Sequence, residues 1–300
     1  MNNLFNITNI SQDIMVILAI DVVIAILLLS AMRVINGLTA KVNTTEELAK
    51  EDNFAFGISV AGSISALGIV MTGAITGEAA NSYELEAIGM FSYGLFGLIL
   101  IKIGRLVHDK LALNQLDKIK QIRERNVAVA LVDAASVIAT AIVIRAVLIW
   151  VEGLNLYTFI AITSGFIVSQ VILILITRIR ETHYARNNQK DSMQEAFCHG
   201  NVALALRYSG QIVSTALAVT AASYFLIYTP ETIVENLVGW LVFGLVMTVV
   251  VSLLTAIAKR IILWGINLSE EVDRQHNVGV ASIEMAISIA IAMILTALMA

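Results

Sequence analysis

Three ionisable residues inside long apolar stretches are the ones whose chemistry would matter most: Asp133, Arg207 and Glu284. A charged side chain is costly in a bilayer unless it is paired or hydrated, so such residues are default candidates for function. Asp133 and Glu284 are therefore predicted to form a proton- or cation-binding pair in a central cavity, with Arg207 as charge partner. The alternative is a set of structural ion pairs with Arg207 and with Lys102 or Arg105, which end a neighbouring apolar stretch.

A repeated sequence motif relates the positions of the two acidic residues. An Asn opens an apolar stretch rich in small residues four times at nearly equal intervals: at Asn53, Asn126, Asn201 and Asn277. Asp133 and Glu284 each lie seven residues after such an Asn, so each shares a helix face with it and lies about 10 Å deeper. The four Asn residues are predicted to hydrogen-bond across helices at the inner boundary of the membrane. A polar collar around a pathway is the alternative.

The composition indicates a membrane protein made of helices. Hydrophobic residues make up 58% of the 300 residues, charged residues only 14%, and the mean hydropathy is +0.83. A helix needs about 20 apolar residues to cross a bilayer, and backbone exposed to lipid must satisfy its own hydrogen bonds. Eight such stretches are predicted, at about 14–36, 53–76, 85–108, 126–150, 155–178, 201–227, 233–259 and 277–299. The fold class is therefore all-α, a polytopic membrane protein in contact with the lipid bilayer.

The basic residues predict the orientation. All Lys and Arg residues except Arg145 and Arg207 fall in or beside four stretches, 33–50, 102–125, 178–190 and 259–274, each of which follows an odd-numbered span. Cationic loops stay in the cytoplasm, so both termini are predicted to lie outside an inner (plasma) membrane. The charged segments that precede the Asn residues are expected to extend the even-numbered helices into the cytoplasm.

Asp21 and Arg145 form a second pair of candidates. Both lie a few residues inside the predicted outer boundary of their spans, and their charges are opposite. Matching depth predicts a structural ion pair between the first and fourth spans. The alternative is that Arg145 extends along its aliphatic stem toward Glu152 at the surface.

The sequence offers little for catalysis. The four His residues, which are His108, His183, His199 and His276, all fall at or near the predicted cytoplasmic surface, without metal-ligand spacing. Cys198 is the only cysteine, and no nucleotide-binding glycine loop is present. We therefore expect no enzyme activity, no cofactor and no metal site. The basic loops are interleaved with acids, so no nucleic-acid partner is expected.

The repeat organises the chain into four units. Each unit has one span rich in Leu, Ile, Val and Phe, followed by one rich in Ala, Gly, Ser and Thr. Small residues let helices pack closely in lipid, so the even-numbered spans are expected at the centre and the odd-numbered ones around them. The units should be parallel and related by an axis along the membrane normal. Two halves, 1–152 and 153–300, are the predicted domains.

One stretch also resembles a known family. The residues RERNVAVALVDAASVIATAIVI (123–144) are similar to those of the YjfL-like bacterial inner-membrane proteins, a family catalogued as domain of unknown function 350. The resemblance covers nearly the whole chain, in a tandemly duplicated form whose second half is more divergent. It implies a role in maintaining the cell envelope under stress, and it assigns no activity to any residue.

Two functions follow from these patterns. The first is passage of a proton, cation or small solute through Asp133 and Glu284. The second is a non-transporting scaffold that docks a soluble cytoplasmic protein on segments 105–125 and 178–200. Association of copies, for example through the glycine-rich second span, is compatible with either. Whether the two carboxylates meet water distinguishes the two functions.

Overall fold

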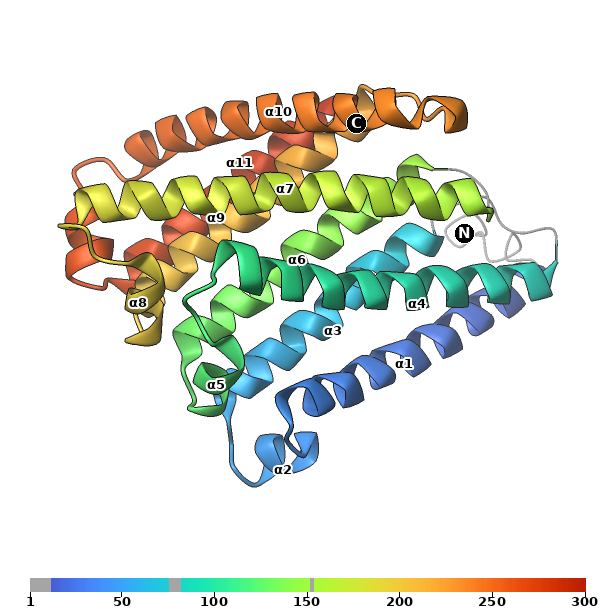
Figure 1. Cartoon of the computed structure of the whole chain (residues 1–300), viewed down its shortest axis with the longest axis horizontal. Helices are drawn as coiled ribbons and strands as arrows, with labels where there is room; N and C mark the ends of the chain where they lie inside the picture. The colour runs from blue at the N-terminus through green and yellow to red at the C-terminus, as the bar shows by residue number, and fades with distance from the viewer. Residues whose placement is uncertain (1–11, 76–81, 152–153) are drawn as a thin grey trace, which may run out of the picture.

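The computed structural model describes residues 12–75, 82–151 and 154–300, and within these residues the chain is helical with no strand. Eight helices in this described part of the chain are long and apolar enough to cross a membrane. They form two layers, which Figure 1 shows one in front of the other. The front layer holds α1 (Gln12–Ala40), α4 (Tyr83–Val107), α7 (Leu156–Asn187) and α10 (Ile233–Ile262). The second layer holds α3 (Phe54–Ile75), α6 (Val127–Trp150), α9 (Val202–Thr220) and α11 (Val278–Met299).

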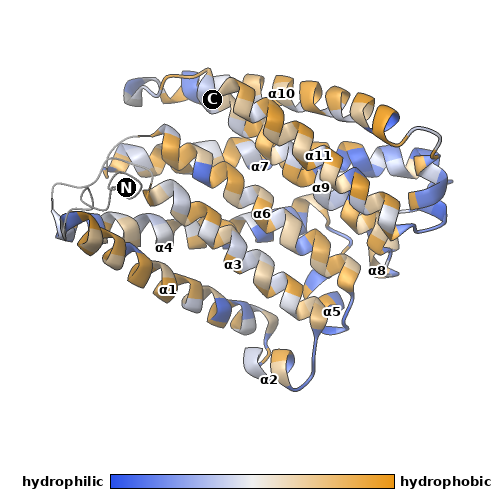
Figure 2. Ribbon diagram, turned by 180° about the vertical axis from the view of Figure 1, so that it is seen from behind, coloured by the Kyte–Doolittle hydropathy of each residue, from blue (hydrophilic) through white to orange (hydrophobic). Residues whose placement is uncertain are grey.

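The second layer is an open row. Its helices contact one another in the order α3, α6, α9, α11, and the front helices pack on one side of this row. Figure 2, seen from behind, shows α3, α6, α9 and α11 side by side with α4, α7 and α10 beyond them. The expectation of even-numbered helices at a centre ringed by the others was therefore wrong. Small residues let these helices approach closely, but in a layer and not around an axis.

Close packing inside the row depends on glycine. A Cβ atom added at Gly62 of α3 would lie 2.5 Å from the Cβ atom of Ala134 on α6. One added at Gly210 of α9 would lie 2.6 Å from the Cα atom of Met285 on α11. Helices that approach this closely gain dispersion contacts, which drive association in lipid. One core of buried residues runs through both halves of the chain, from Leu28 to Trp240.

Short segments connect the two layers at one end, which we call the basic end. They are α2 (Thr44–Ala49), α5 (Lys118–Arg123), α8 (Met193–Cys198) and the π-helical turns η2 (His108–Ala112) and η5 (Ser269–Arg274). Figure 2 shows hydrophilic residues gathered around α5 and α8. At the opposite end lie the 3₁₀ turns η3 (Ala221–Tyr224) and η4 (Pro230–Thr232). Helix α9 therefore ends earlier than its predicted limit at residue 227.

The segments before the four Asn residues do not extend the following helices, contrary to the prediction. The residue before each Asn has a positive φ: Asp52 (47°), Arg125 (66°), Gly200 (78°) and His276 (55°). This conformation costs about 1–2 kcal/mol for residues other than glycine and stops a helix. The chain therefore turns sharply, and each Asn begins a new helix.

Candidate functional site

Asp133 lies inside the protein, where Oδ2 of its carboxylate is paired and Oδ1 has no hydrogen-bond partner among the described residues. It is 0% exposed on α6, and its Oδ2 atom accepts a hydrogen bond from Ser59 Oγ on α3 at 2.6 Å. Nη2 of Arg105, which comes from α4, lies 2.8 Å from the same oxygen. Lys118 Nζ lies 4.0 Å from Oδ1. Three elements thus converge on one carboxylate, and charge-assisted hydrogen bonds of this length are strong ones.

A second set of polar groups continues from Lys118. Its side chain is 1% exposed, and Nζ lies 2.5 Å from Asp109 Oδ1 and 3.5 Å from His108 Nδ1. Nε2 of His108 lies 2.9 Å from the hydroxyl oxygen of Tyr208, which is 3.2 Å from Thr177 Oγ1. His108 is buried within the protein and begins η2 at the basic end. We call Asp133, Arg105, Lys118, Asp109 and Ser59 the Asp133 cluster.

Glu284 on α11 has a comparable environment. It is 3% exposed, and its Oε2 atom accepts a hydrogen bond from Arg207 Nε on α9 at 2.6 Å. Lys259 Nζ of α10 lies 3.3 Å from Oε1. The same guanidinium donates from Nη1 to Asp273 Oδ1 at 2.5 Å and from Nη2 to the carbonyl of Leu268 at 2.8 Å. We call Glu284, Arg207, Lys259 and Asp273 the Glu284 cluster.

The two clusters share a plan. Each joins two carboxylates to two cations, so the charges within each balance. Ser59 and Arg207 both lie six residues after their Asn, and each contacts a carboxylate that lies seven residues after the next Asn along the row. Removing one partner of such a buried set is costly, because the remaining charge loses its counterion. The arrangement can hold helices at a fixed register.

The structure brings some of the predicted residues together and leaves others apart. Arg207 and Glu284 meet, as do Asp133 and Arg105, which was one of the predicted structural partners. Asp133 and Glu284 belong to separate clusters on α6 and α11, and α9 packs against both of these helices. Lys102 instead donates to Asn36 Oδ1 of α1 at 2.5 Å.

The predicted ion pair between Asp21 and Arg145 is wrong. Arg145 Nε donates to Thr72 Oγ1 on α3 at 2.9 Å, and Oδ1 of Asp21 has no hydrogen-bond partner among the described residues. Equal depth did not bring the two residues together, because α1 packs on α3 and α4 whereas α6 occupies the next place in the row. Glu152, the alternative partner of Arg145, lies outside the described residues.

The four Asn residues cap helices. Oδ1 of each accepts a hydrogen bond from the backbone N–H three residues later: from Phe56, Val129, Leu204 and Val280. Nδ2 of Asn53 also donates to the carbonyls of Ile122 and Arg123 at the end of α5. Nδ2 of Asn126 donates to those of Phe197 and Cys198 at the end of α8. Capping satisfies a backbone donor that would otherwise be unpaired. The additional bonds of Asn53 and Asn126 tie the first unit to the second and the second unit to the third.

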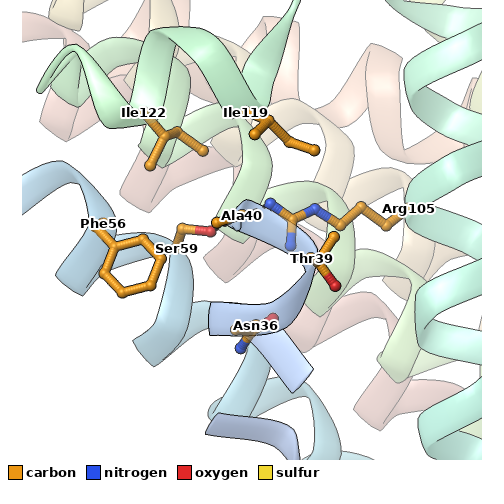
Figure 3. A pocket seen from close by; sticks show the side chains of 8 residues that line it. All are labelled: Asn36, Thr39, Ala40, Phe56, Ser59, Arg105, Ile119 and Ile122. Atoms are coloured by element: carbon orange, nitrogen blue, oxygen red, sulfur yellow. Dashed lines mark hydrogen bonds between the residues drawn. The ribbon is translucent and has the colours of Figure 1, made fainter. Parts of the chain in front are cut away.

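A small cavity reaches the edge of the Asp133 cluster (Figure 3). Its lining includes Ser59 and Arg105, with Asn36 and Thr39 of α1 and Ile122 of α5, but not Asp133. Its volume is about 10 Å³, enough for about one water molecule. This cavity therefore gives water room beside Ser59 and Arg105, the partners of the carboxylate.

The sequence did not predict several members of the two clusters, which are Ser59, Asp109, Lys118, Lys259 and Asp273. Ser59 occupies the same position relative to its Asn as Arg207, so the repeat could have identified it. Asp109, Lys118 and Asp273 lie in the charged segments, which look solvated in the sequence and fold back under the helices. No group of three or more His, Cys, Asp or Glu residues in the described part of the chain could hold a metal ion.

Comparison with known proteins gives one match. A family model described as Domain of Unknown Function (DUF350) matches residues 9–148 and again residues 153–299. No curated protein matches the chain. No solved structure matches it either.

Proposed function

This chain belongs to the DUF350 family, whose domain it carries twice, and we propose that it is a non-transporting membrane scaffold and not an enzyme. The observation that carries the proposal is the state of the two carboxylates. Asp133 is 0% exposed and Glu284 3% exposed, and each lies against a guanidinium at 2.8 Å or closer. A site that exchanges ions with water needs a hydrated route, and neither carboxylate lines the cavity beside Ser59.

The position of the clusters supports the same conclusion. Every charged contact within them joins different helices or a helix to the segment that precedes it: Arg105 on α4 to Asp133 on α6, Arg207 on α9 to Glu284 on α11, and Lys259 on α10 to Glu284. Buried ionic groups of this kind can specify one packing arrangement. In this scaffold they set the register between the two layers.

The basic end is the part we propose for contact with a soluble protein. The positive-inside rule places it in the cytoplasm of a bacterial inner membrane, with both chain termini outside. A polar hollow of about 420 Å³ opens there between the ends of α5 and α8, and its lining includes Gln121, Arg125 and His199. Cys198 also lines it, but burial and the nearby charge of Glu195 raise the pKa of its thiol, so it is a poor nucleophile.

Proton passage is the competing function, and one observation favours it. The polar groups from Asp133 through Lys118 and His108 to Tyr208 and Thr177 form a line from α6 to α7. The separation of 4.0 Å between Asp133 Oδ1 and Lys118 Nζ exceeds a hydrogen-bond distance. A proton would therefore have to cross a gap at the carboxylate that this function requires.

Flux measurements in sealed proteoliposomes decide between the two functions. The wild-type protein would be reconstituted with a pH-sensitive dye inside and challenged with gradients of protons, sodium and potassium. The matched variant is Asp133→Asn combined with Glu284→Gln, reconstituted at equal density. We expect wild-type flux equal to that of empty vesicles, and a lowered thermal unfolding temperature for the variant. Wild-type flux that disappears in a variant of unchanged stability would refute the scaffold and establish transport.

A further inference from the structure

The three contacts within the row of inner helices follow one register. Counting from each Asn, the ninth residue of one helix packs on the eighth residue of the next: Gly62 against Ala134, and Gly210 against Met285. Further along the first of these pairs, a Cβ atom added at Gly73 would lie 3.2 Å from the Cα atom of Arg145, again with an offset of one residue. Each helix thus presents one face to its successor and another to its predecessor.

The contact between α6 and α9 obeys the same rule. Ser209 Oγ donates to the carbonyl of Leu131 at 3.3 Å, and Thr296 Oγ1 of α11 donates to that of Leu217 on α9 at the same distance. In both bonds the donor is three residues further from its Asn than the acceptor. All three steps of the row therefore repeat the same geometry.

The face that α11 would present to a successor is uncovered. At the ninth position from the Asn, the residues are Gly62, Ala135, Gly210 and Ala286, all small. At the thirteenth, they are Ala66, Ala139, Ser214 and Ala290. These residues are buried in α3, α6 and α9, but Ala286 and Ala290 are exposed. Lipid-facing residues elsewhere are large, for example Leu253 and Ile257 of α10.

The face that α3 would present to a predecessor is uncovered too. The eighth position holds Ala134 and Ser209 in α6 and α9, where both are buried, and Ala61 in α3, where it is exposed. Helix α11 thus has an uncovered face of the kind that packs on the next helix of the row. Helix α3 has an uncovered face of the kind that receives the preceding helix, which we call the receiving face.

We propose that these two faces meet in the membrane, so that α11 of one copy of this chain packs on α3 of a second copy and continues the row. The occupant is a second copy because the missing partner of α11 is a helix with the receiving face of α3, at the register used three times within the chain. The contact is heterologous, so copies add head to tail into a ring or a line. This assembly goes beyond the scaffold function and does not depend on it.

Cysteine cross-linking of the full chain in native membranes tests the assembly. Cys198 is the only cysteine in the chain, so Cys198→Ser gives a clean background. Two differently tagged copies would carry Ala61→Cys and Ala286→Cys, and a disulfide between them needs Cβ atoms about 3.5–4.5 Å apart. We expect oxidation to produce a dimer containing both tags and no dimer from either variant alone. A single chain carrying both cysteines should give a ladder of oligomers.

Two controls make the result decisive. Ile257→Cys lies on the lipid-exposed side of α10 close to Lys259, the partner of Glu284, and therefore at a depth similar to Ala286. Paired with Ala61→Cys, it should link several-fold less. Ala135→Cys with Ser209→Cys repeats the same register inside one chain and should link intramolecularly. Linking of the internal pair without any link between Ala61→Cys and Ala286→Cys would overturn the proposal, and so would equal linking through Ile257→Cys.

A bulky substitution gives an independent readout. Ala286 is exposed and contacts no successor within the chain, so Ala286→Leu should leave the thermal unfolding temperature unchanged. In subunit counting by single-molecule photobleaching, we expect it to convert multi-copy spots to single copies. An unchanged number of copies per spot with this variant would contradict the register that we propose.

Discussion

The Asp133 and Glu284 clusters occupy equivalent places in the two halves of the chain but differ in how the carboxylate is balanced. Asp133 receives a neutral hydroxyl from the preceding inner helix, through Ser59, whereas Glu284 receives a cation at the same position, through Arg207. The first cluster takes one of its cations, Lys118, from α5, the segment that precedes α6. The repeated helices thus set the position of each carboxylate, and its counterions can come from different elements.

The clusters also differ in burial. Asp133 lies on α6, in the interior of the row, and the side chain of its partner Arg105 is 11% exposed. Glu284 lies on α11 at the end of the row, and the side chain of Arg207 is 15% exposed. A lost counterion should therefore matter more in the first cluster than in the second, where water can approach the remaining charge.

The largest expected effect is that of Asp133→Asn. It leaves the guanidinium of Arg105 and the ammonium of Lys118 buried with Asp109 as the only acid. Breaking a buried pair in this way costs about 3–5 kcal/mol, which should appear as a strongly lowered unfolding temperature in detergent. Glu284→Gln should cost less. Equal losses in both variants would show that position within the row does not set the cost.

A substitution that copies one cluster into the other sharpens the comparison. Arg207→Ser gives α9 the residue that α3 has at the same position, and Glu284 keeps Lys259. The substitution leaves Asp273 without the guanidinium that it contacts. We therefore expect the free energy of unfolding to fall by about 1–3 kcal/mol. Adding Asp273→Asn should recover part of the unfolding temperature. Failure of the second substitution to recover any stability would mean that Arg207 acts mainly through Glu284.

The capping Asn residues should show a smaller contrast of the same kind. Asn277→Ala removes a helix cap, which costs about 1 kcal/mol, and a bond to Glu271 within the segment that precedes its own helix. Asn126→Ala removes a cap and also the bonds to the carbonyls of Phe197 and Cys198, so it should lower the unfolding temperature further. Asn126→Asp, which keeps the cap and loses the donor, should lie between the two. The idea of linked units would fail if Asn126→Ala and Asn277→Ala were equivalent.

The smallest effect is expected at Asp21. Its Oδ1 atom is buried without a hydrogen-bond partner among the described residues, so Asp21→Asn removes a charge that no cation balances there. We expect an unfolding temperature equal to or above that of the wild type. A clear loss of stability would reveal a role for Asp21 that differs from that of the two clustered carboxylates.

The sequence predicted the repeated elements well and the contacts between helices poorly. The eight spans follow from apolar length, and the pairing of Arg207 with Glu284 follows from position relative to the Asn, because both are local properties; the family follows from the resemblance of residues 123–144. The layered arrangement, the burial of His108 and the failure of Asp21 to reach Arg145 depend on which helices are neighbours. The depth of a residue along its helix can be counted from the sequence. Which helices of similar composition become neighbours depends on packing over the whole chain.

A double-mutant cycle between Asp133 and Arg105 tests most directly whether the buried charges hold the helices together. Asp133→Asn and Arg105→Met would be measured singly and together by thermal and chemical unfolding. Residues in contact couple by about 0.5–3 kcal/mol, and replacing a whole buried pair can be nearly neutral. We predict that the double variant is more stable than either single one. Losses that simply add would show that Asp133 is not held by Arg105 and would contradict the account.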